Sequence, residues 1–194
     1  MRGVLRAKFD YASQPITSVK NEQYLRACFN TGITPFFVNV WDNSKLMVPH
    51  LKHNDYIETE VILCPWKDNE GEYHYNYKTR SGIKLIDEPP ELGLFFEVEG
   101  VITSLDVHIG CGKGNRVIAI DPQAHLRTKE QRGKAFQKKL YRVHLVIPQD
   151  TNILEGLDKG SKIKVNGLID PTNEDRIIFT KVFTITPIGE LINV

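Results

Sequence analysis

One short pattern occurs twice in this chain of 194 residues and constrains its fold more than any other feature. Residues 51–61 (LKHNDYIETEV) and residues 157–167 (LDKGSKIKVNG) each begin with a leucine, followed three residues later by Asn54 or Gly160. Asn and Gly are the residues that best tolerate a left-handed backbone, the conformation in which many helices end. Alternating residues typical of a strand follow in both segments. Each segment is therefore predicted to be a capped helical turn that leads into a β-strand.

The rest of the chain is predicted to be mostly β. β-Branched and aromatic residues are abundant, and no long amphipathic helix is evident. The predicted strands lie near residues 2–10, 23–30, 35–42, 55–66 and 72–86, with a helical turn at 46–53, and then near residues 93–108, 115–121, 140–148, 161–169 and 175–187, with a short helix at 151–158.

The repeated segment resembles the element that precedes the fourth strand of the OB-fold, a five-stranded barrel that binds oligonucleotides or oligosaccharides. Two copies, each with strands before and after it, predict an all-β protein made of two OB-fold Greek-key barrels in tandem. Residues 86–93 interrupt the apolar alternation with two prolines and three acids, as a short linker does. The predicted domains are a first barrel at 1–88, a linker at 89–93 and a second barrel at 94–194.

Composition indicates an ordinary globular protein, with 41% hydrophobic and 25% charged residues. We expect it to be cytoplasmic and not membrane-bound, because the apolar runs are only strand-length and no secretory signal is evident. Three unclustered cysteines, Cys28, Cys64 and Cys111, argue against a disulfide framework or a zinc site. No cofactor or metal is expected, and buried reduced thiols are the preferred interpretation of Cys28 and Cys64.

Alternation predicts which side chains of the second and third strands point outward. In residues 24–29 the apolar set Leu25, Ala27 and Phe29 is expected inside, and in residues 36–41 the set is Phe36, Val38 and Val40. Cys28 falls on the outer side by this alternation. In an OB barrel these two strands carry the usual ligand face, which here combines aromatic, amide and guanidinium groups. The candidate binding residues on it are Tyr24, Arg26, Phe37, Asn39 and Trp41.

The hairpin over residues 56–80 resembles the corresponding hairpin of bacterial single-stranded DNA-binding proteins. Its returning strand alternates tyrosines with polar and cationic residues, a pattern that suits base stacking beside phosphate contacts. The alternative, that the tyrosines simply fill the barrel, is equally compatible with the alternation. The candidate binding residues are Trp66, Tyr73, Tyr75, Tyr77, Lys78 and Arg80.

Net charge is only +1, but basic residues concentrate in one segment between the second and third strands of the second barrel. The insert lies at 125–139, and from Arg127 to Arg142 the sequence contains a single acid, Glu130, against seven basic side chains. In single-stranded DNA-binding proteins this connection is often a long basic finger, whereas a solvated surface loop is the alternative. The candidate phosphate contacts are Arg116, Arg127, Lys129, Arg132, Lys134, Lys138, Lys139 and Arg142.

Enzymatic chemistry is the weaker class. The glycine-rich stretch at 106–114 lacks the Gly-Lys-Ser/Thr ending of a phosphate loop, and a strand rather than a helix is predicted after it. His108 and Cys111 have ligand-like spacing, but two residues do not make a zinc site. No triad order or HExxH motif stands out among the histidines. We therefore predict a protein that is not an enzyme.

As architecture, both halves resemble tandem OB-fold proteins such as bacterial single-stranded DNA-binding protein and replication protein A. The resemblance implies non-catalytic binding of single-stranded DNA in replication, recombination or transfer, and a possible homo-oligomer. The chain ends GELINV, unlike the acidic tip of the bacterial proteins, so recruitment of partner enzymes through such a tip is not supported. RNA binding by the same face and a protein-binding scaffold remain alternatives.

Overall fold

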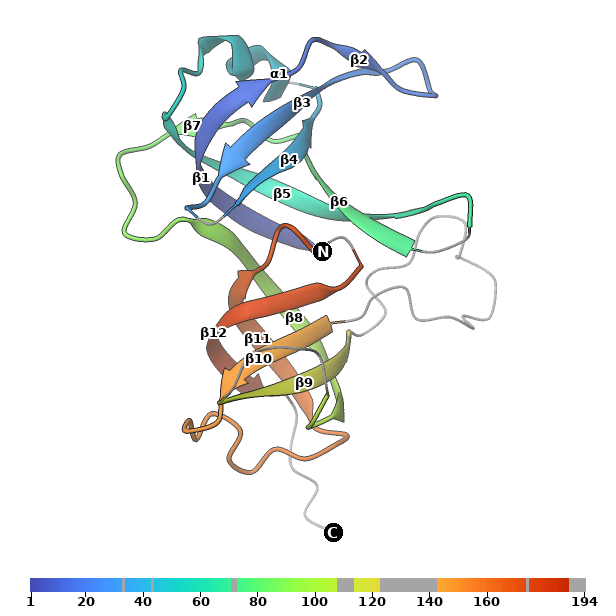
Figure 1. The fold of residues 1–194 in the computed structure, drawn as a ribbon, viewed down its shortest axis with the longest axis vertical. Coiled ribbons are helices and arrows are strands. Elements are labelled where there is room, and N and C mark those ends of the chain that lie inside the picture. Colours follow the sequence, from blue (N-terminus) through green and yellow to red (C-terminus); the bar gives the residue numbers. More distant parts are fainter. Residues whose placement is uncertain are drawn as a thin grey trace. The chain divides into compact units, whose positions relative to one another are not determined.

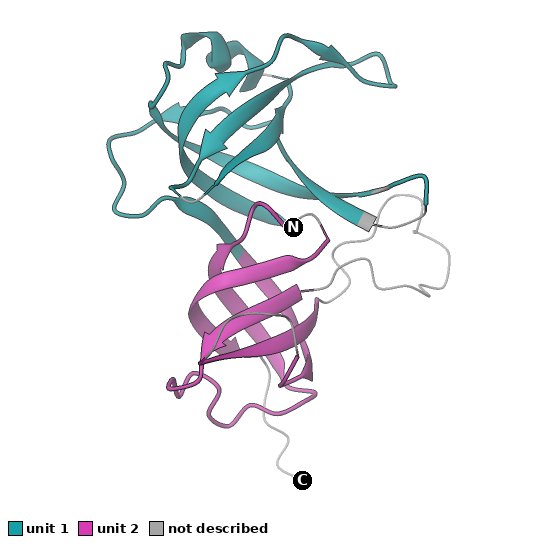
Figure 2. Ribbon diagram, in the orientation of Figure 1, with its two compact units in different colours: residues 1–96 teal, residues 97–194 magenta. Residues whose placement is uncertain are grey.

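The chain folds into two compact units, Met1–Phe96 and Glu97–Val194, which are coloured separately in Figure 2. The structure is a computed structural model that describes residues 1–32, 34–42, 44–70, 73–107, 114–122, 143–173 and 175–188. Within these residues one short α-helix and one 3-10 turn accompany the strands. The predicted all-β class is confirmed.

The first unit is a closed barrel of five strands (Figure 1): β1 (Arg2–Ala12), β3 (Gln23–Asn30), β4 (Pro35–Val40), β5 (Tyr56–Lys67) and β6 (Tyr73–Thr79). Their order around the barrel is β1-β3-β4-β6-β5, and β1 closes the ring by pairing with β5. All pairs are antiparallel except β4 with β6. This order, with a parallel pair between the third and fifth strands, is that of the predicted OB-fold.

Four short elements complete the first unit around this barrel. The α-helix α1 (Ser44–Met47) and the 3-10 turn η1 (Val48–His50) connect β4 to β5, where the helical turn is predicted. Strand β2 (Ile16–Thr17) is not predicted from the sequence, and strand β7 (Lys84–Leu85) falls within the single strand predicted near 72–86. The single strand expected over 72–86 is therefore wrong, because β6 ends at Thr79 and pairing resumes only at Lys84.

The second unit repeats the strand order with β8 (Gly93–Ser104), β9 (Asn115–Pro122), β10 (Val143–Pro148), β11 (Lys162–Ile169) and β12 (Ile177–Pro187). β8 pairs with β9, β9 with β10, β10 in parallel with β12, β12 with β11, and β11 with β8. The first four residues of β8 pair with β1 and so belong to the first unit. Whether 1–88 and 94–194 fold as independent domains stays a prediction.

The helix expected at 151–158 is absent from this described stretch. The segment instead contains separate turns, in which the amides of Glu155 and Leu157 donate to the carbonyls of Asn152 and Leu154, both at 3.0 Å. Gly156 adopts a φ of 75°, which an α-helix does not accommodate. The positive φ therefore keeps the turns from continuing as a helix.

The repeated segment has the same hydrogen-bonded structure in both units. In the first unit Asn54 has a φ of 71°, its amide donates to Phe9 O at 2.8 Å, and Asp55 accepts a bond from the Lys52 amide at 2.8 Å. In the second unit Gly160 has a φ of 98° and its amide donates to Ile102 O at 2.8 Å. In each barrel the residues just before the fourth strand are thus hydrogen-bonded to the first strand.

Each unit has its own apolar core, built from the inward side of the strands. The largest fully buried side chains include Leu5, Phe29 and Ile57 in the first unit and Leu145 and Phe179 in the second. No helix formed by the described residues is long and apolar enough to cross a membrane.

Candidate nucleic-acid interface

The outer surface of β3, β4 and β6 brings several of the predicted binding residues into one cross-strand row. Arg26 on β3 lies opposite Asn39 on β4, and Asn39 lies opposite Lys78 on β6. Side chains of residues directly opposite each other in neighbouring strands lie on the same face of a sheet. The neighbouring residues Ala27 and Val38 point into the core and are fully buried. We call this outer surface the β3–β4–β6 face.

Aromatic rings on the β3–β4–β6 face are held by each other and by guanidinium groups. The rings of Tyr24 and Trp41 stack at 4.6 Å between centroids with 20° between their planes. The guanidinium of Arg26 lies 4.4 Å from the centre of the Phe37 ring, and that of Arg80 lies 5.7 Å from the Trp41 ring. Cation–π contacts of this kind orient both partners. The rings are therefore arranged before any ligand arrives.

The face is suited to stacking of nucleobases. Phe37 is 38% exposed, and Tyr24 and Trp41 are half-buried, so ring surface is open to solvent. Sequence-tolerant binding of single strands combines such aromatic platforms with cations that follow the phosphates. Here Arg26, Lys78 and Arg80 supply those cations beside the rings. The predicted residues of β3 and β4, with Lys78 and Arg80, thus lie on one face, as the alternation indicated.

One ion pair and the protonation state of one thiol affect the charge of this face. Arg80 forms an ion pair with Asp42 at 3.2 Å, and both side chains are about half exposed. Burial raises the pKa of the Cys64 thiol, an effect that the nearby charges of Lys78 and Arg80 only partly oppose. Cys64 is therefore a neutral thiol at neutral pH, and the face keeps its positive charge.

The tyrosine stripe of β6 belongs mainly to the core, and its predicted role in stacking is wrong for Tyr75 and Tyr77. These two side chains are only 4% and 5% exposed, and Tyr77 packs edge-on against Phe36 at 5.9 Å between ring centres. Two-residue alternation identifies a common face but does not say which face is inside. The side chain of the third member, Tyr73, lies outside the described residues.

Trp66 stands apart from the β3–β4–β6 face on the β5–β6 hairpin. It is 44% exposed, and its ring lies 4.9 Å from the ring of His74, its cross-strand partner. His74 Nε2 in turn lies 2.9 Å from Asp68 Oδ2. Trp66 therefore offers an exposed ring at a second position on the same barrel.

The outer side of β3 contains a buried thiol, as predicted for Cys28, and lies beside one residue that the sequence did not reveal. Cys28 is on the outer side but only 2% exposed, because its neighbours across the strands are Tyr11 and Phe37, whose rings meet edge to face at 6.2 Å. Tyr11 was not predicted because a β-bulge between Phe9 and Tyr11 breaks the alternation of β1. Tyr11 is 53% exposed and extends the aromatic row beyond Phe37.

The second unit presents different side chains at the corresponding positions. Where β9, β10 and β12 pair, the side chains that alternate with the core residues are Val117, Ala119, His144, Val146, Ile178 and Thr180, of which Val117 and His144 are buried. Apart from His144 these are aliphatic or hydroxyl-bearing side chains, unlike the rings and cations of the first unit. Arg116 is held by Asp106 at 2.9 Å and by the Leu105 carbonyl at 3.0 Å. In the described part of the second unit, a ring beside a cation is found instead further along β12, where Lys181 Nζ lies 5.3 Å from the centre of the exposed Phe183 ring.

Apart from Arg116, the predicted basic contacts of the second unit lie outside the described residues. They are Arg127, Lys129, Arg132, Lys134, Lys138, Lys139 and Arg142. The glycine-rich stretch with His108 and Cys111 also lies mostly outside them. Among described residues, no group of three or more His, Cys, Asp or Glu side chains is arranged to hold a metal ion.

No protein-family model matches the chain, and no curated protein matches its sequence. Two solved structures share its fold over nearly the whole length. A deletion variant of the single-stranded DNA binding protein from Thermus aquaticus has a TM-score of 0.59 at 13% identity, covering 97% of this chain and 95% of that one. The wild-type protein from Thermus aquaticus has a TM-score of 0.57 at 14% identity, covering 97% and 94%. Identity this low establishes a common fold and nothing finer.

Proposed function

We propose that this protein binds single-stranded DNA without catalysing a reaction, and that the β3–β4–β6 face of its first barrel is the main contact. The observation that carries the proposal is the coupling of rings and cations on that face, in which Arg26 lies over Phe37 and Arg80 over Trp41. Bases stack on such rings while guanidinium groups are close enough to contact phosphates. The fold shared with single-stranded DNA binding proteins supports the same function.

In this proposal the bound strand is protected or presented during replication, recombination or transfer. The basic segment at 125–139 adds phosphate contacts by virtue of its charge. Trp66 provides a further stacking position, because its ring is exposed. Self-association of the protein belongs to the same proposal as a way of extending the binding surface along a strand.

The test is a titration of tryptophan fluorescence with an unstructured dT oligonucleotide, for the wild type and Phe37→Ala. Phe37 is 38% exposed and outside the core, so its removal should leave the fold intact. Loss of one stacking ring should weaken binding by about 1–3 kcal/mol. The matched control is Leu85→Ala, which removes another exposed apolar side chain (54% exposed) from β7 of the same unit. Equal affinity of both variants and wild type would rule out the β3–β4–β6 face.

RNA is the second candidate ligand, because the same rings and cations accept its bases and phosphates. Only RNA offers a 2′-hydroxyl, so matched DNA and RNA oligonucleotides separate the two. Tighter binding of the RNA oligonucleotide would make RNA, and not DNA, the ligand in the proposal. Binding of neither strand would leave the protein-binding scaffold as the remaining alternative.

A further inference from the structure

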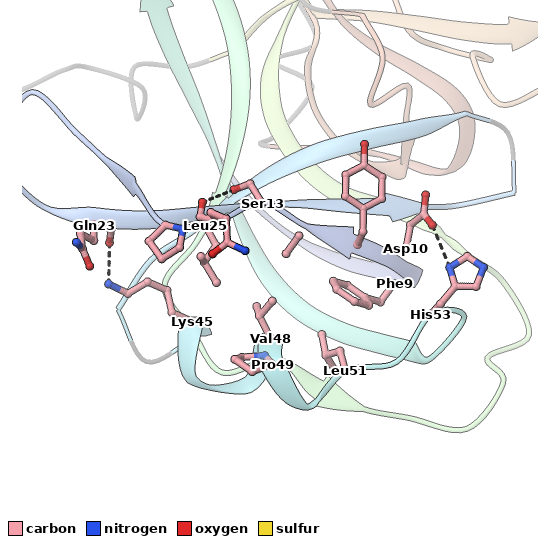
Figure 3. Close-up of a pocket in the computed structure, with 14 residues that line it drawn as sticks. Phe9, Asp10, Ser13, Gln23, Leu25, Lys45, Val48, Pro49, Leu51 and His53 are labelled. Atoms are coloured by element: carbon pink, nitrogen blue, oxygen red, sulfur yellow. Dashed lines mark hydrogen bonds and ion pairs between the residues drawn. The ribbon is translucent and has the colours of Figure 1, made fainter.

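A cavity of about 670 Å³ opens at one end of the first barrel, next to the β3–β4–β6 face (Figure 3). Its walls come from the end of β1, the start of β3, and the α1–η1 connection. Figure 3 shows Val48, Pro49 and Leu51 on one side of it and Ser13 and Asp10 on the other. The volume lies within the range of small-ligand sites.

The inner wall of the cavity is apolar because residues of the barrel core line it. Phe9, Val48 and Leu51 line it and are almost fully buried, whereas Leu25 lines it and is only half-buried. The connection formed by α1 and η1 contributes Lys45, Val48 and Pro49 to the lining at this end of the barrel. Leu25, which the alternation placed in the core, therefore faces this cavity.

The rim of the cavity is polar and able both to donate and to accept hydrogen bonds. Gln14 and Gln23 line it with exposed side-chain amides, for which no hydrogen bond to another described residue is found. Lys45 lies at the rim, where its Nζ donates to Gln23 O at 2.7 Å. The lining contains one carboxylate, Asp10, which lies 3.0 Å from His53 Nδ1.

Tyr11 connects the cavity to the β3–β4–β6 face. It lines the cavity, and its ring also makes the edge contact with Phe37, which lies under the guanidinium of Arg26. Ser13, another lining residue, accepts a hydrogen bond from the Arg26 amide at 3.0 Å. A DNA strand that stacks on Phe37 and continues past Tyr11 would therefore reach the mouth of the cavity.

We propose that this cavity takes one unstacked nucleobase of the bound strand and gives the protein a preference among bases. The inference rests on the proposed function, because it is the β3–β4–β6 face that delivers the strand. A base has apolar faces and a polar edge, which match an apolar wall and an amide rim. Single strands expose those edges, and glutamine amides pair with them in a base-dependent way.

The experiment is a titration of the isotope-labelled full chain with dA, dC and dT oligonucleotides of equal length, followed by methyl NMR and tryptophan fluorescence. The methyl signals of Ala12, Leu25, Val48 and Leu51 report on the cavity, and the fluorescence reports on the face. We expect cavity methyl shifts with the preferred homopolymer. Gln23→Leu should then weaken binding of the preferred homopolymer about tenfold and should change binding of the other homopolymers little.

Two further variants complete the design. Ala12→Leu, which fills the cavity, should abolish both the methyl shifts and the preference, and Gln23→Leu still tests the proposal if Ala12→Leu misfolds. Gln149→Leu is the matched control, because it removes an exposed glutamine from the second unit. Fluorescence quenching without any cavity methyl shift, or an unchanged preference in Gln23→Leu, overturns the base-binding cavity and leaves the proposed function standing. Absence of both quenching and shifts overturns the proposed function itself.

Discussion

Trp41 is the single residue on which the β3–β4–β6 face depends most. It stacks on Tyr24 and accepts the guanidinium of Arg80 over its ring. We predict that Trp41→Ala weakens binding of a dT oligonucleotide by about 1–3 kcal/mol. The chain has two tryptophans, so fluorescence quenching in this variant should fall to whatever Trp66 contributes.

The companion variant is Trp66→Ala. Because the proposal gives Trp66 only a further stacking position, this variant should keep most of the quenching. Trp41→Ala also loses the stack with Tyr24, so unfolding should become easier by about 0.5–1.5 kcal/mol. Its indole N–H has no partner among the described residues, and no hydrogen bond to them is lost. Undiminished affinity in a folded Trp41→Ala variant would remove Trp41 from the interface.

At the same scale, the sequence predicts orientation well where strands are regular and poorly where they are not. The outward positions of Arg26, Phe37 and Asn39 follow from simple alternation in β3 and β4. Tyr11 does not, because a bulge shifts the register of β1. Cys28 is on the expected side but is covered by neighbouring rings, and coverage depends on side chains that are distant in sequence.

At the scale of elements, the repeated turn was the most reliable signal because its geometry is local. A residue that tolerates positive φ and a nearby capping side chain fix the turn without help from the rest of the chain. The prediction of a helix at 151–158 was wrong for a local reason too. Gly156 adopts a positive φ there, and this conformation makes a turn and interrupts a helix. The short strands β2 and β7 exist only through pairing with β3 and β5, which local sequence does not encode.

Close packing between neighbouring strands gives a prediction about β8. A Cβ at Gly100 would lie 2.6 Å from the Asp121 carbonyl oxygen on β9 and would also meet the Ile120 side chain. Gly100→Ala should therefore destabilise the protein by about 1–3 kcal/mol, as other overpacking substitutions do. Urea unfolding followed by circular dichroism measures the effect.

The matched control is Gly82→Ala, because a Cβ there meets nothing within 4 Å and the backbone φ is not in the left-handed region. That variant should change the free energy of unfolding by no more than about 0.5–1 kcal/mol. Equal unfolding midpoints for the two variants would show that β8 and β9 separate easily enough to admit a methyl group.

At the scale of the whole molecule, the order of the strands was predictable, but the difference between the two barrels was not. Strand spacing and turn chemistry repeat in both halves, and they specify the same topology twice. The side chains at the paired positions do not repeat: the first barrel carries rings and cations there, and the second carries mainly aliphatic groups where β9, β10 and β12 pair. A net charge of +1 likewise hides how unevenly the charges are distributed along the chain.

That distribution leads to a prediction about salt. If the basic segment contacts phosphates, each engaged charge steepens the slope of log affinity against log salt by about 0.7 for a single strand. Replacing Lys134, Lys138 and Lys139 together by Gln should then flatten the slope by up to about 2. It should also weaken binding of oligonucleotides of every sequence alike. The measurement is a salt titration of wild type and variant on one oligonucleotide.

The control must change net charge by the same amount, so that a local contact is distinguished from the overall field of the protein. Lys52, Lys84 and Lys159 are exposed and outside both the basic segment and the β3–β4–β6 face, and their triple replacement by Gln serves this purpose. A flatter slope only in the first variant locates the phosphate contacts in the basic segment. Parallel lines for wild type and both variants would mean that the first barrel holds the strand through its own Arg26, Lys78 and Arg80.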